Sequence, residues 1–264
     1  MAQTGAMIAT KRAPAADWRP ALLRVATIAA VLSGWEILAR SGWLFRDVVP
    51  GLSAIGAAVA GLLADSSFYG HLGWTLFEIV MALCIGGGAG LLVGLMLGAI
   101  PLLGRAYEPI LTYLGPTPKI IFFPVMLLAF GVGPGSKIAM GAISCFFPVA
   151  LSIVAGMRAI DSTLIKVGRS FRASSGQMVA KIYLPALRDP AINGLRLGLG
   201  IATIGTLLAE TKLSNRGAGY LIINAFTTFN MPRMYALLVV LFLLAIAANA
   251  FASSFSASLN AARR

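Results

Sequence analysis

The sequence predicts an all-α polytopic membrane protein with about six transmembrane helices. Its mean hydropathy is +0.86 and only 11% of its 264 residues are charged, whereas soluble globular proteins average about 25%. Three stretches of 26, 20 and 29 residues carry no charge: Ile79–Gly104, Ile138–Met157 and Met234–Ala262. Each reaches the roughly 20 apolar residues that a membrane-crossing helix needs.

Shorter charge-free runs extend to spanning length when flanking charges lie at the membrane interface. We therefore expect six spans, near residues 21–40, 77–102, 107–132, 136–157, 191–211 and 233–256. Together they form one transmembrane domain, residues 21–260, between tails at 1–20 and 261–264. The first span is expected to be an uncleaved anchor, because no clear small-x-small cleavage site follows it.

Basic residues are distributed unevenly over the two sides of such a bundle. With both termini in the cytosol, the cytosolic side collects 15 of the 21 lysines and arginines, seven of them between Arg158 and Arg196. Loops rich in Lys and Arg stay on the cytosolic side, so we expect the termini and residues 158–190 there. This topology and anionic lipid account for most of the net charge of +12, and we expect no nucleic-acid partner.

Residues 41–76 form the one long outer connection. Pro50 and Gly51 lead into the apolar stretch Leu52–Ala64, which Asp65 ends. An apolar segment too short to cross the bilayer is typical of a helix on the membrane surface. We therefore predict a short surface helix at this position.

The second span carries a glycine at every fourth position: Gly86, Gly90, Gly94 and Gly98. Residues four apart share one helix face, so this face has no side chains and another helix can approach it closely. We interpret the four glycines as helix-packing residues, with a pore-lining role as the alternative.

The third span is interrupted by prolines in the sequence EPILTYLGPTPKIIFFP. Proline removes a backbone donor and kinks a helix. Broken helix at membrane depth is tolerated only against protein or a water-filled path. This span is therefore expected inside the bundle, beside a transport route.

Five residues are candidates for that route. Lys119 follows the break at Pro116 and could attract an anionic solute, although snorkelling to the headgroups is the commoner use of such a lysine. Glu210 is a carboxylate near a membrane interface, where helix anchoring or an ion pair is the alternative. Phe123 and Phe146 could line an aromatic-tolerant path, although packing in the core or against lipid is commoner.

Catalytic and metal-binding patterns are absent from the sequence. It has one histidine, His71, and its two cysteines, Cys84 and Cys145, both fall inside predicted spans. The stretch GVGPGSK has serine where a phosphate-binding loop needs glycine before the lysine, and isoleucine where it needs Ser or Thr after it. We expect no metal, no cofactor and no enzymatic activity in this chain.

The basic island at residues 158–190 predicts two short helices, near 161–171 and 174–182. The pair Leu184-Pro185 is expected to end the second helix and to start the next span. Apolar residues, among them Met178, gather on one side of this second helix. An amphipathic helix of this kind on the cytosolic side suits docking to a partner protein.

Several motifs occur in a fixed order around this island. Ile182-Tyr183-Leu184-Pro185 is followed by GLRLGLG at 194–200 and GAGYLI at 217–222, and is preceded by FPVMLLAFGVGPGSKI at 123–138. Over roughly residues 45–260 the chain resembles the permease subunits of bacterial ABC importers of the nitrate, sulfonate, taurine and bicarbonate type. The Leu-Pro end matches the cytosolic loop signature of that family.

The first half of the signature departs from the family pattern. Arg172 stands at the family's glycine position, and Lys166-Val167-Gly168 replaces Glu-Ala-Ala. A glycine there permits a turn that a side chain would strain. The change in charge also suggests an ATPase partner with a more acidic groove.

The resemblance implies the type I ABC importer permease fold with a cytosolic coupling helix in the bacterial inner membrane. The ATPase-coupling residues that it implies are Lys166, Gly168, Arg172, Ala173, Ser174, Gln177, Met178, Lys181, Leu184 and Pro185. The implied partners are cytosolic ABC ATPase subunits that bind ATP and Mg²⁺, a periplasmic solute-binding protein, and a second permease copy in a homodimer. The implied solute is small and anionic, such as a sulfonate, nitrate, bicarbonate or an aromatic carboxylate.

An ATPase-independent secondary transporter or channel is the alternative from another class. The single six-span unit without an inverted repeat and the amphipathic cytosolic helix argue against it. A membrane-embedded enzyme is a third option, which the lack of a polar constellation in the spans disfavours.

Overall fold

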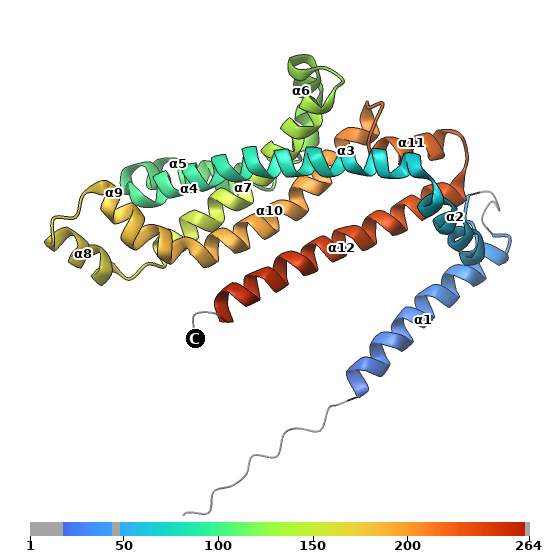
Figure 1. Ribbon diagram of the computed structural model, residues 1–264, viewed down its shortest axis with the longest axis horizontal. Coiled ribbons are helices and arrows are strands. Elements are labelled where there is room, and N and C mark those ends of the chain that lie inside the picture. Colours follow the sequence, from blue (N-terminus) through green and yellow to red (C-terminus); the bar gives the residue numbers. More distant parts are fainter. Residues whose placement is uncertain (1–17, 44–47, 262–264) are drawn as a thin grey trace, which may run out of the picture.

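The structure is a computed structural model that describes residues 18–43 and 48–261. Within these ranges every regular element is a helix, which confirms the predicted all-α class (Figure 1). The α-helices are α1 (Arg19–Arg40), α2 (Leu52–Ala64), α3 (Ser66–Ala82), α4 (Gly88–Ala99), α5 (Pro101–Leu114), α6 (Phe123–Phe130), α7 (Pro134–Arg158), α8 (Ser162–Ser170), α9 (Ser175–Met178), α10 (Leu184–Lys212), α11 (Ala218–Thr227) and α12 (Met231–Ala261). The predicted tails at 1–20 and 261–264 lie almost wholly outside the described residues.

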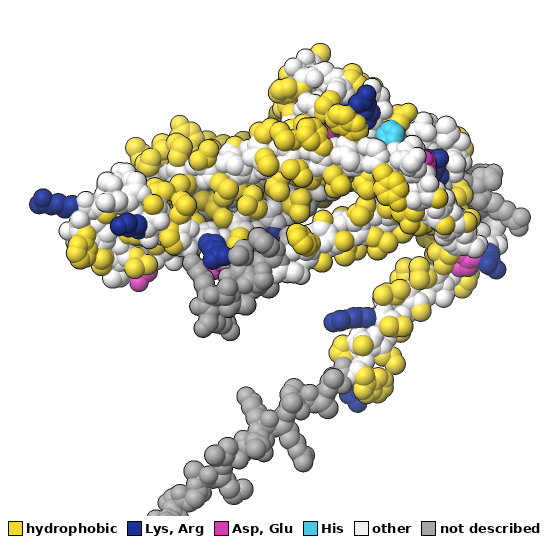
Figure 2. All heavy atoms as spheres, in the orientation of Figure 1, with side chains coloured by type: hydrophobic (Ala, Val, Ile, Leu, Met, Phe, Trp, Pro, Cys, Tyr) yellow, Lys and Arg dark blue, Asp and Glu magenta, His cyan; other side chains and the backbone are white. Residues whose placement is uncertain are grey.

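Five continuous helices of the described chain are long and apolar enough to cross a membrane: Arg19–Arg40, Ser66–Ala99, Pro134–Arg158, Ser175–Lys212 and Met231–Phe251. A sixth crossing results if α5 and α6 count as one broken span. The prediction of about six spans is therefore confirmed, and the chain is a multi-pass membrane protein. Figure 2 shows hydrophobic side chains along most of the visible length of the bundle.

The predicted third span is not a single helix. Helices α5 and α6 meet at an angle of 92°, and α6 projects away from the bundle (Figure 1). Pro116 and Pro118 have no N–H group with which to continue the helical hydrogen bonds, and Pro118 has the extended ψ of 102°. The segment 107–132 is thus a sharp bend rather than a straight crossing.

The second span is longer than the sequence indicated. It starts at Ser66 rather than near residue 77, because the Asp65 side chain caps α3 by accepting a hydrogen bond from the Ser67 N–H at 3.0 Å. A π-helical turn at Leu83–Gly87 joins α3 to α4. The predicted short helix at Leu52–Ala64 is present as α2.

The Leu184-Pro185 pair does not end a helix, contrary to the prediction. A π-helical turn at Val179–Tyr183 leads directly into α10, so that Ser175–Lys212 is one continuous helical segment. In this turn the Leu184 N–H donates to the carbonyl of Val179, five residues earlier. Pro185 follows this turn inside the continuous segment, where it has no N–H to donate.

Helix α7 lies at the centre of the bundle, packed between α4 and α10. The glycine face of α4 rests directly on it. A Cβ atom on Gly90 would lie 2.8 Å from the carbonyl oxygen of Phe146, and one on Gly94 would lie 2.7 Å from that of Ala150. Gly86 and Gly98 contact Ala142 and Met157 of the same helix. The four glycines therefore let two backbones approach as small residues do in membrane bundles.

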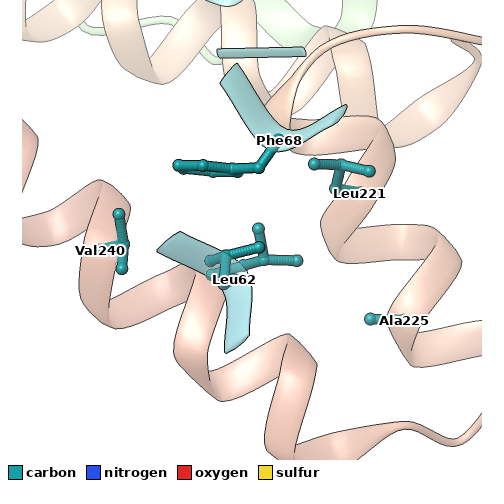
Figure 3. Packing of buried hydrophobic residues seen from close by; sticks show 6 residues of the cluster. Leu62, Phe68, Leu221, Ala225 and Val240 are labelled. Carbon is teal, nitrogen blue, oxygen red and sulfur yellow. The ribbon is translucent and has the colours of Figure 1, made fainter. Parts of the chain in front are cut away.

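At one end of the bundle, α2, α3, α11 and α12 share an apolar cluster (Figure 3). Its buried members are Leu62, Phe68, Leu221, Ala225, Leu237 and Val240. Helix α1 joins the bundle only near this end, where the Trp35 indole N–H donates to the carbonyl of Pro50 and Glu36 accepts from the Leu52 N–H at 2.8 Å. No residue of α1 is buried, and it extends away from the other helices (Figure 1).

Candidate functional site: the loop between α7 and α10

The two short helices predicted in the basic island are both present and form the α8–α9 loop, residues 159–183, at the end of the bundle away from α2 (Figure 1). Asp161 starts α8 by accepting a hydrogen bond from the Thr163 N–H at 2.8 Å. This backbone hydrogen bond lowers the pKa of the Asp161 carboxyl, so the group is charged at the positive end of the helix dipole. The start of α8 is thus determined by a residue next to it in the sequence.

The turn between α8 and α9 contains a residue in a strained conformation. Arg172 has a φ of 53°, in the left-handed region that glycine adopts easily. The Ala173 N–H donates to the carbonyl of Gly168 at 3.0 Å and closes the turn. An arginine therefore occupies a backbone conformation that glycine adopts more easily.

Helix α9 begins with a capping box. The Ser174 hydroxyl accepts from the Gln177 N–H at 3.3 Å, and the Gln177 side chain accepts from the Ser174 N–H at 2.9 Å. Two backbone donors that the helix itself cannot use are thereby satisfied. Ser174 and Gln177, both expected at the ATPase contact, hold the local shape of the loop.

The inner side of the loop is packed against the spans. Met178 and Tyr183 are 7% and 8% exposed and lie in one apolar cluster with Ile153 and Met157 of α7. A Cβ atom on Gly168 would lie 2.7 Å from the Met178 sulfur, so α8 approaches α9 closely because this residue has no side chain. Met178 and Gly168 therefore join the loop to the spans.

The outer side of α8 carries an apolar stripe that the sequence interpretation missed. Leu164, Val167 and Phe171 are 53%, 47% and 83% exposed. Their spacing of three and four residues places them on one helix face, and this spacing was the signal available in the sequence. Of the predicted coupling residues, Lys166, Arg172, Ser174, Gln177, Lys181, Leu184 and Pro185 are exposed and Ala173 is half-buried. The loop thus presents apolar side chains among basic ones.

The candidate route residues are divided between two places. The Lys119 ammonium donates to the carbonyls of Leu114 and Gly115 at the α5–α6 break, and lies 4.8 Å from the centre of the Phe147 ring. Phe123 is buried at the start of α6. Phe146 packs edge-on against Phe147, with their ring centres 5.1 Å apart. Pro116, Lys119, Phe123 and Phe146 thus belong to α7 and to the bent segment beside it.

Glu210 lies elsewhere, in a buried polar cluster near the opposite end of α10. This Glu210 cluster comprises Thr75, Glu78, Lys137 and Glu210, each no more than 4% exposed. Glu210 accepts from the Thr75 hydroxyl and from the Gly219 N–H, both at 2.7 Å, and the Thr75 oxygen accepts from the Ala218 N–H at 2.7 Å. Of this cluster only Glu210 was among the predicted route residues, and its partner Thr75, 135 residues away, leaves no local pattern in the sequence.

Lys137 and the neighbouring Gly217 connect the Glu210 cluster to two turns. Lys137 donates to the carbonyls of Val132 and Gly133 and so fixes the turn between α6 and α7. Gly217 has a φ of 100°, and a Cβ atom there would overlap the Glu210 carboxylate. The cluster therefore ties the α10–α11 connection and the α6–α7 turn into the bundle.

Comparisons with known proteins agree with this architecture. The family described as binding-protein-dependent transport system inner membrane component matches residues 86–264. A putative aliphatic sulfonates transport permease protein of Bacillus subtilis is 31% identical over 79% of this chain and 74% of its own length. The taurine transport system permease protein of Escherichia coli is 29% identical over 78% of this chain and 77% of its own length.

A solved structure shares the fold. A chain of the MetNI methionine ABC transporter in an inward-facing conformation matches 74% of this chain and 98% of its own length, with a TM-score of 0.61 at 18% sequence identity. A second crystal form of the same transporter gives a TM-score of 0.58 at 20% identity. At this level of identity the likeness concerns the fold alone.

Proposed function

The chain belongs to the family of binding-protein-dependent transport system inner membrane components. From that premise we propose that a cytosolic ATPase binds its α8–α9 loop and moves it during ATP hydrolysis. The predicted permease fold of a type I ABC importer is confirmed. The chain is the permease component of an importer and not an enzyme, because ATP hydrolysis in such systems resides in a separate subunit. The secondary-transporter alternative is thereby set aside.

The apolar stripe on α8 is the observation that carries this proposal. Three large apolar side chains, two of them on α8 and the third that of Phe171 directly after it, form an exposed patch that a soluble loop would not otherwise display. Phe171 is the most exposed of them, and an aromatic side chain seated in a partner's pocket is the usual anchor of an interface. Lys166 and Arg169 flank the stripe and suit an acidic rim on the ATPase.

The path of transmission runs from α9 into α10. Because Ser175–Lys212 is continuous, a displacement of α9 is passed to α10 through helical backbone. The π-helical turn at Val179–Tyr183 is the irregular part of this segment, and turns of this kind recur at functional positions. Helix α10 packs along α7, so the displacement reaches the centre of the bundle.

We assign the α8–α9 loop to the cytosol and the Glu210 cluster to the periplasmic side. The excess of Lys and Arg in residues 158–196 supports this orientation. On this assignment ATP and Mg²⁺ are bound by the ATPase partner, a periplasmic binding protein delivers the solute to the opposite face, and a second copy of the permease completes the path.

The solute that we propose is a small organic anion of the sulfonate class. The two relatives named above are described as permeases for aliphatic sulfonates and for taurine. Lys119 supports the proposal because a cation beside a broken span is rare at membrane depth and suits an anionic solute. Its present partners are neutral, namely two carbonyl groups and the Phe147 ring, so its charge is not cancelled.

The ATPase contact is tested with a matched pair of phenylalanines. Phe171 and Phe229 are 83% and 73% exposed in turns at opposite ends of the bundle. We expect Phe171→Ala to weaken capture of the purified ATPase subunit about 30-fold, the loss of roughly 2 kcal/mol typical of an interface anchor. Phe229→Ala should leave capture unchanged. Equal capture by both variants would refute the assignment of α8 as the docking surface.

A further inference from the structure

A groove of about 860 Å³ lies between α10 and α12 and includes one residue of α11. Its walls are apolar over most of their length, with residues such as Ile204, Leu241 and Phe242. The polar lining residues are Asn193, Arg196, Thr203 and Asn249. The Thr203 hydroxyl is satisfied by the carbonyl of Leu199 at 2.8 Å, so the remaining three form the polar part of the groove.

Arg196 is held in a defined position within this groove. Its Nε donates to the Asn249 side-chain oxygen at 2.9 Å, which joins α10 to α12. Among the described residues, no other hydrogen bond or ion pair is formed by the guanidinium group. Its two terminal nitrogens therefore remain available for a planar anion with two acceptor oxygens, the geometry that phosphate and carboxylate groups offer.

The depth of Arg196 follows from the lengths of the helices. Arg196 lies 16 residues from Lys212 along α10, and Asn249 lies 16 residues from Arg233 along α12. At 1.5 Å per residue both are about 24 Å from these cationic helix ends. Because the hydrocarbon core is about 30 Å thick, Arg196 lies near the opposite membrane interface, on the side of the α8–α9 loop.

The groove has the length of one bilayer leaflet. Beyond Arg196 the lining of α10 continues to Leu207, and beyond Asn249 the lining of α12 continues to Leu238. Eleven residues of helix measure about 16 Å, which is half of the hydrocarbon thickness. A molecule with its head at Arg196 and its tail along the groove would therefore lie within a single leaflet.

The charge pattern disfavours the other obvious occupant, helix α1 of a second copy. Arg24 lies 16 residues from Arg40 at the other end of α1, so it reaches the same depth as Arg196. Seating α1 in the groove would place two arginines at one level beside an apolar wall, where like charges repel strongly. An anionic occupant has no such cost.

We propose that the groove between α10 and α12 binds an anionic phospholipid of the leaflet on the α8–α9 side, with its phosphate on Arg196 and Asn249 and an acyl chain along α10. The proposed orientation of the importer makes this the cytosolic leaflet, which is the anionic one. Lipid binding itself is a property of the permease alone. If ATPase capture failed, the leaflet could no longer be identified as cytosolic. The proposed lipid site would be unaffected.

The site is tested by titrating the purified full-length chain in detergent with phosphatidylglycerol and, separately, with phosphatidylcholine, and counting bound lipids by native mass spectrometry. We expect R196Q to weaken phosphatidylglycerol binding about fivefold, as expected for one basic contact, and R196K to retain most of it. R188Q removes the same charge from the same helix outside the groove and should change binding less than twofold.

A second variant tests the apolar part of the groove. Because a Cβ atom on Gly200 would have no atom within 4 Å, G200L should fill the groove without disturbing the helices and weaken binding of both lipids.

Two results would overturn the proposal. Equal losses in R196Q and R188Q would mean that phosphatidylglycerol follows general surface charge. Unchanged lipid binding in R196Q and G200L, with dissociation of a dimer in G200L, would assign the groove to a second copy of the chain instead.

Discussion

Two connections flank α10: the α8–α9 loop before it and the α10–α11 connection after it. They are attached to the bundle by different forces. The α10–α11 connection is held by buried hydrogen bonds to Glu210 and Thr75. The α8–α9 loop is held by the apolar cluster around Met157 and Met178, and its outer face stays exposed. Directional buried hydrogen bonds fix one geometry, whereas a face without partners is free to bind. We therefore call the α10–α11 connection around Glu210 the fixed end, and the α8–α9 loop the working end.

The largest effect is expected from removing the centre of the fixed end. Glu210→Ala leaves the Gly219 N–H without its acceptor and leaves the Thr75 hydroxyl with only the more distant carbonyl of His71, at 3.4 Å. Each such loss costs about 1–3 kcal/mol, so we expect the free energy of unfolding in mixed micelles to fall by about 3 kcal/mol. Lys212→Ala, an exposed position two residues away, should change it by less than about 0.5 kcal/mol. Similar losses in both variants would show that the end is not specifically fixed.

A smaller effect is expected where the working end rests on the spans. Gly168→Leu forces a side chain against Ile182 and Met178, and overpacking of this kind costs about 1–3 kcal/mol. We expect faster hydrogen exchange throughout α8 and little change near Glu210. Gly176→Leu is the control, because a Cβ atom there meets no atom within 4 Å. If exchange near Glu210 accelerates as well, the two ends are not independent.

Relief of backbone strain should act in the stabilising direction. Arg172 has a φ of 53°, a conformation that costs a side-chain-bearing residue about 1–2 kcal/mol, and part of this gain is offset by the flexibility of glycine in the unfolded chain. We expect Arg172→Gly to raise the stability of the loop by about 0.5–1 kcal/mol, measured by hydrogen exchange. Arg169→Gly, inside α8, should lower it by about 1 kcal/mol. A destabilised Arg172→Gly variant would mean that the arginine makes contacts that outweigh its strain.

The smallest effect concerns pH. The hydrogen bond from the Thr163 backbone lowers the pKa of Asp161 in the folded protein, so its contribution to stability is complete above the usual Asp value of 3.8. That contribution is lost as the pH falls from there through the lowered folded pKa. The pKa of the Asp65 carboxyl is lowered in the same way, chiefly by its hydrogen bonds with Ser67. We expect the first turn of α8 to fray below about pH 4, as seen by exchange, and Asp161→Asn to abolish this dependence. A dependence that persists in the asparagine variant would point to another group.

Much of the fold follows from local patterns in the sequence. Long apolar runs give the spans, Gly90 and Gly94 give the packing face of the second span, and Asp161 marks the start of α8. These features depend on residues close in sequence, and so their physical effect can be inferred without a structure.

Other features could not be inferred because they depend on distant partners or on a change of helix type. Thr75 and Glu210 are 135 residues apart, and no pattern links them. The π-helical turn before Pro185 lets a helix continue where a proline ordinarily ends one. The exposed stripe around Phe171 is different, since its spacing was visible in the sequence and only its exposure needed the structure.

The most direct test of the distinction between the two ends is amide hydrogen exchange of the full chain with and without its ATPase subunit and ATP. We expect slow exchange at Ala218 and Gly219 in both conditions, and fast exchange across residues 162–172 that becomes slow only when the ATPase is bound. Protection that appears around Gly219 instead, with residues 162–172 unchanged, would contradict the assignment of the working end.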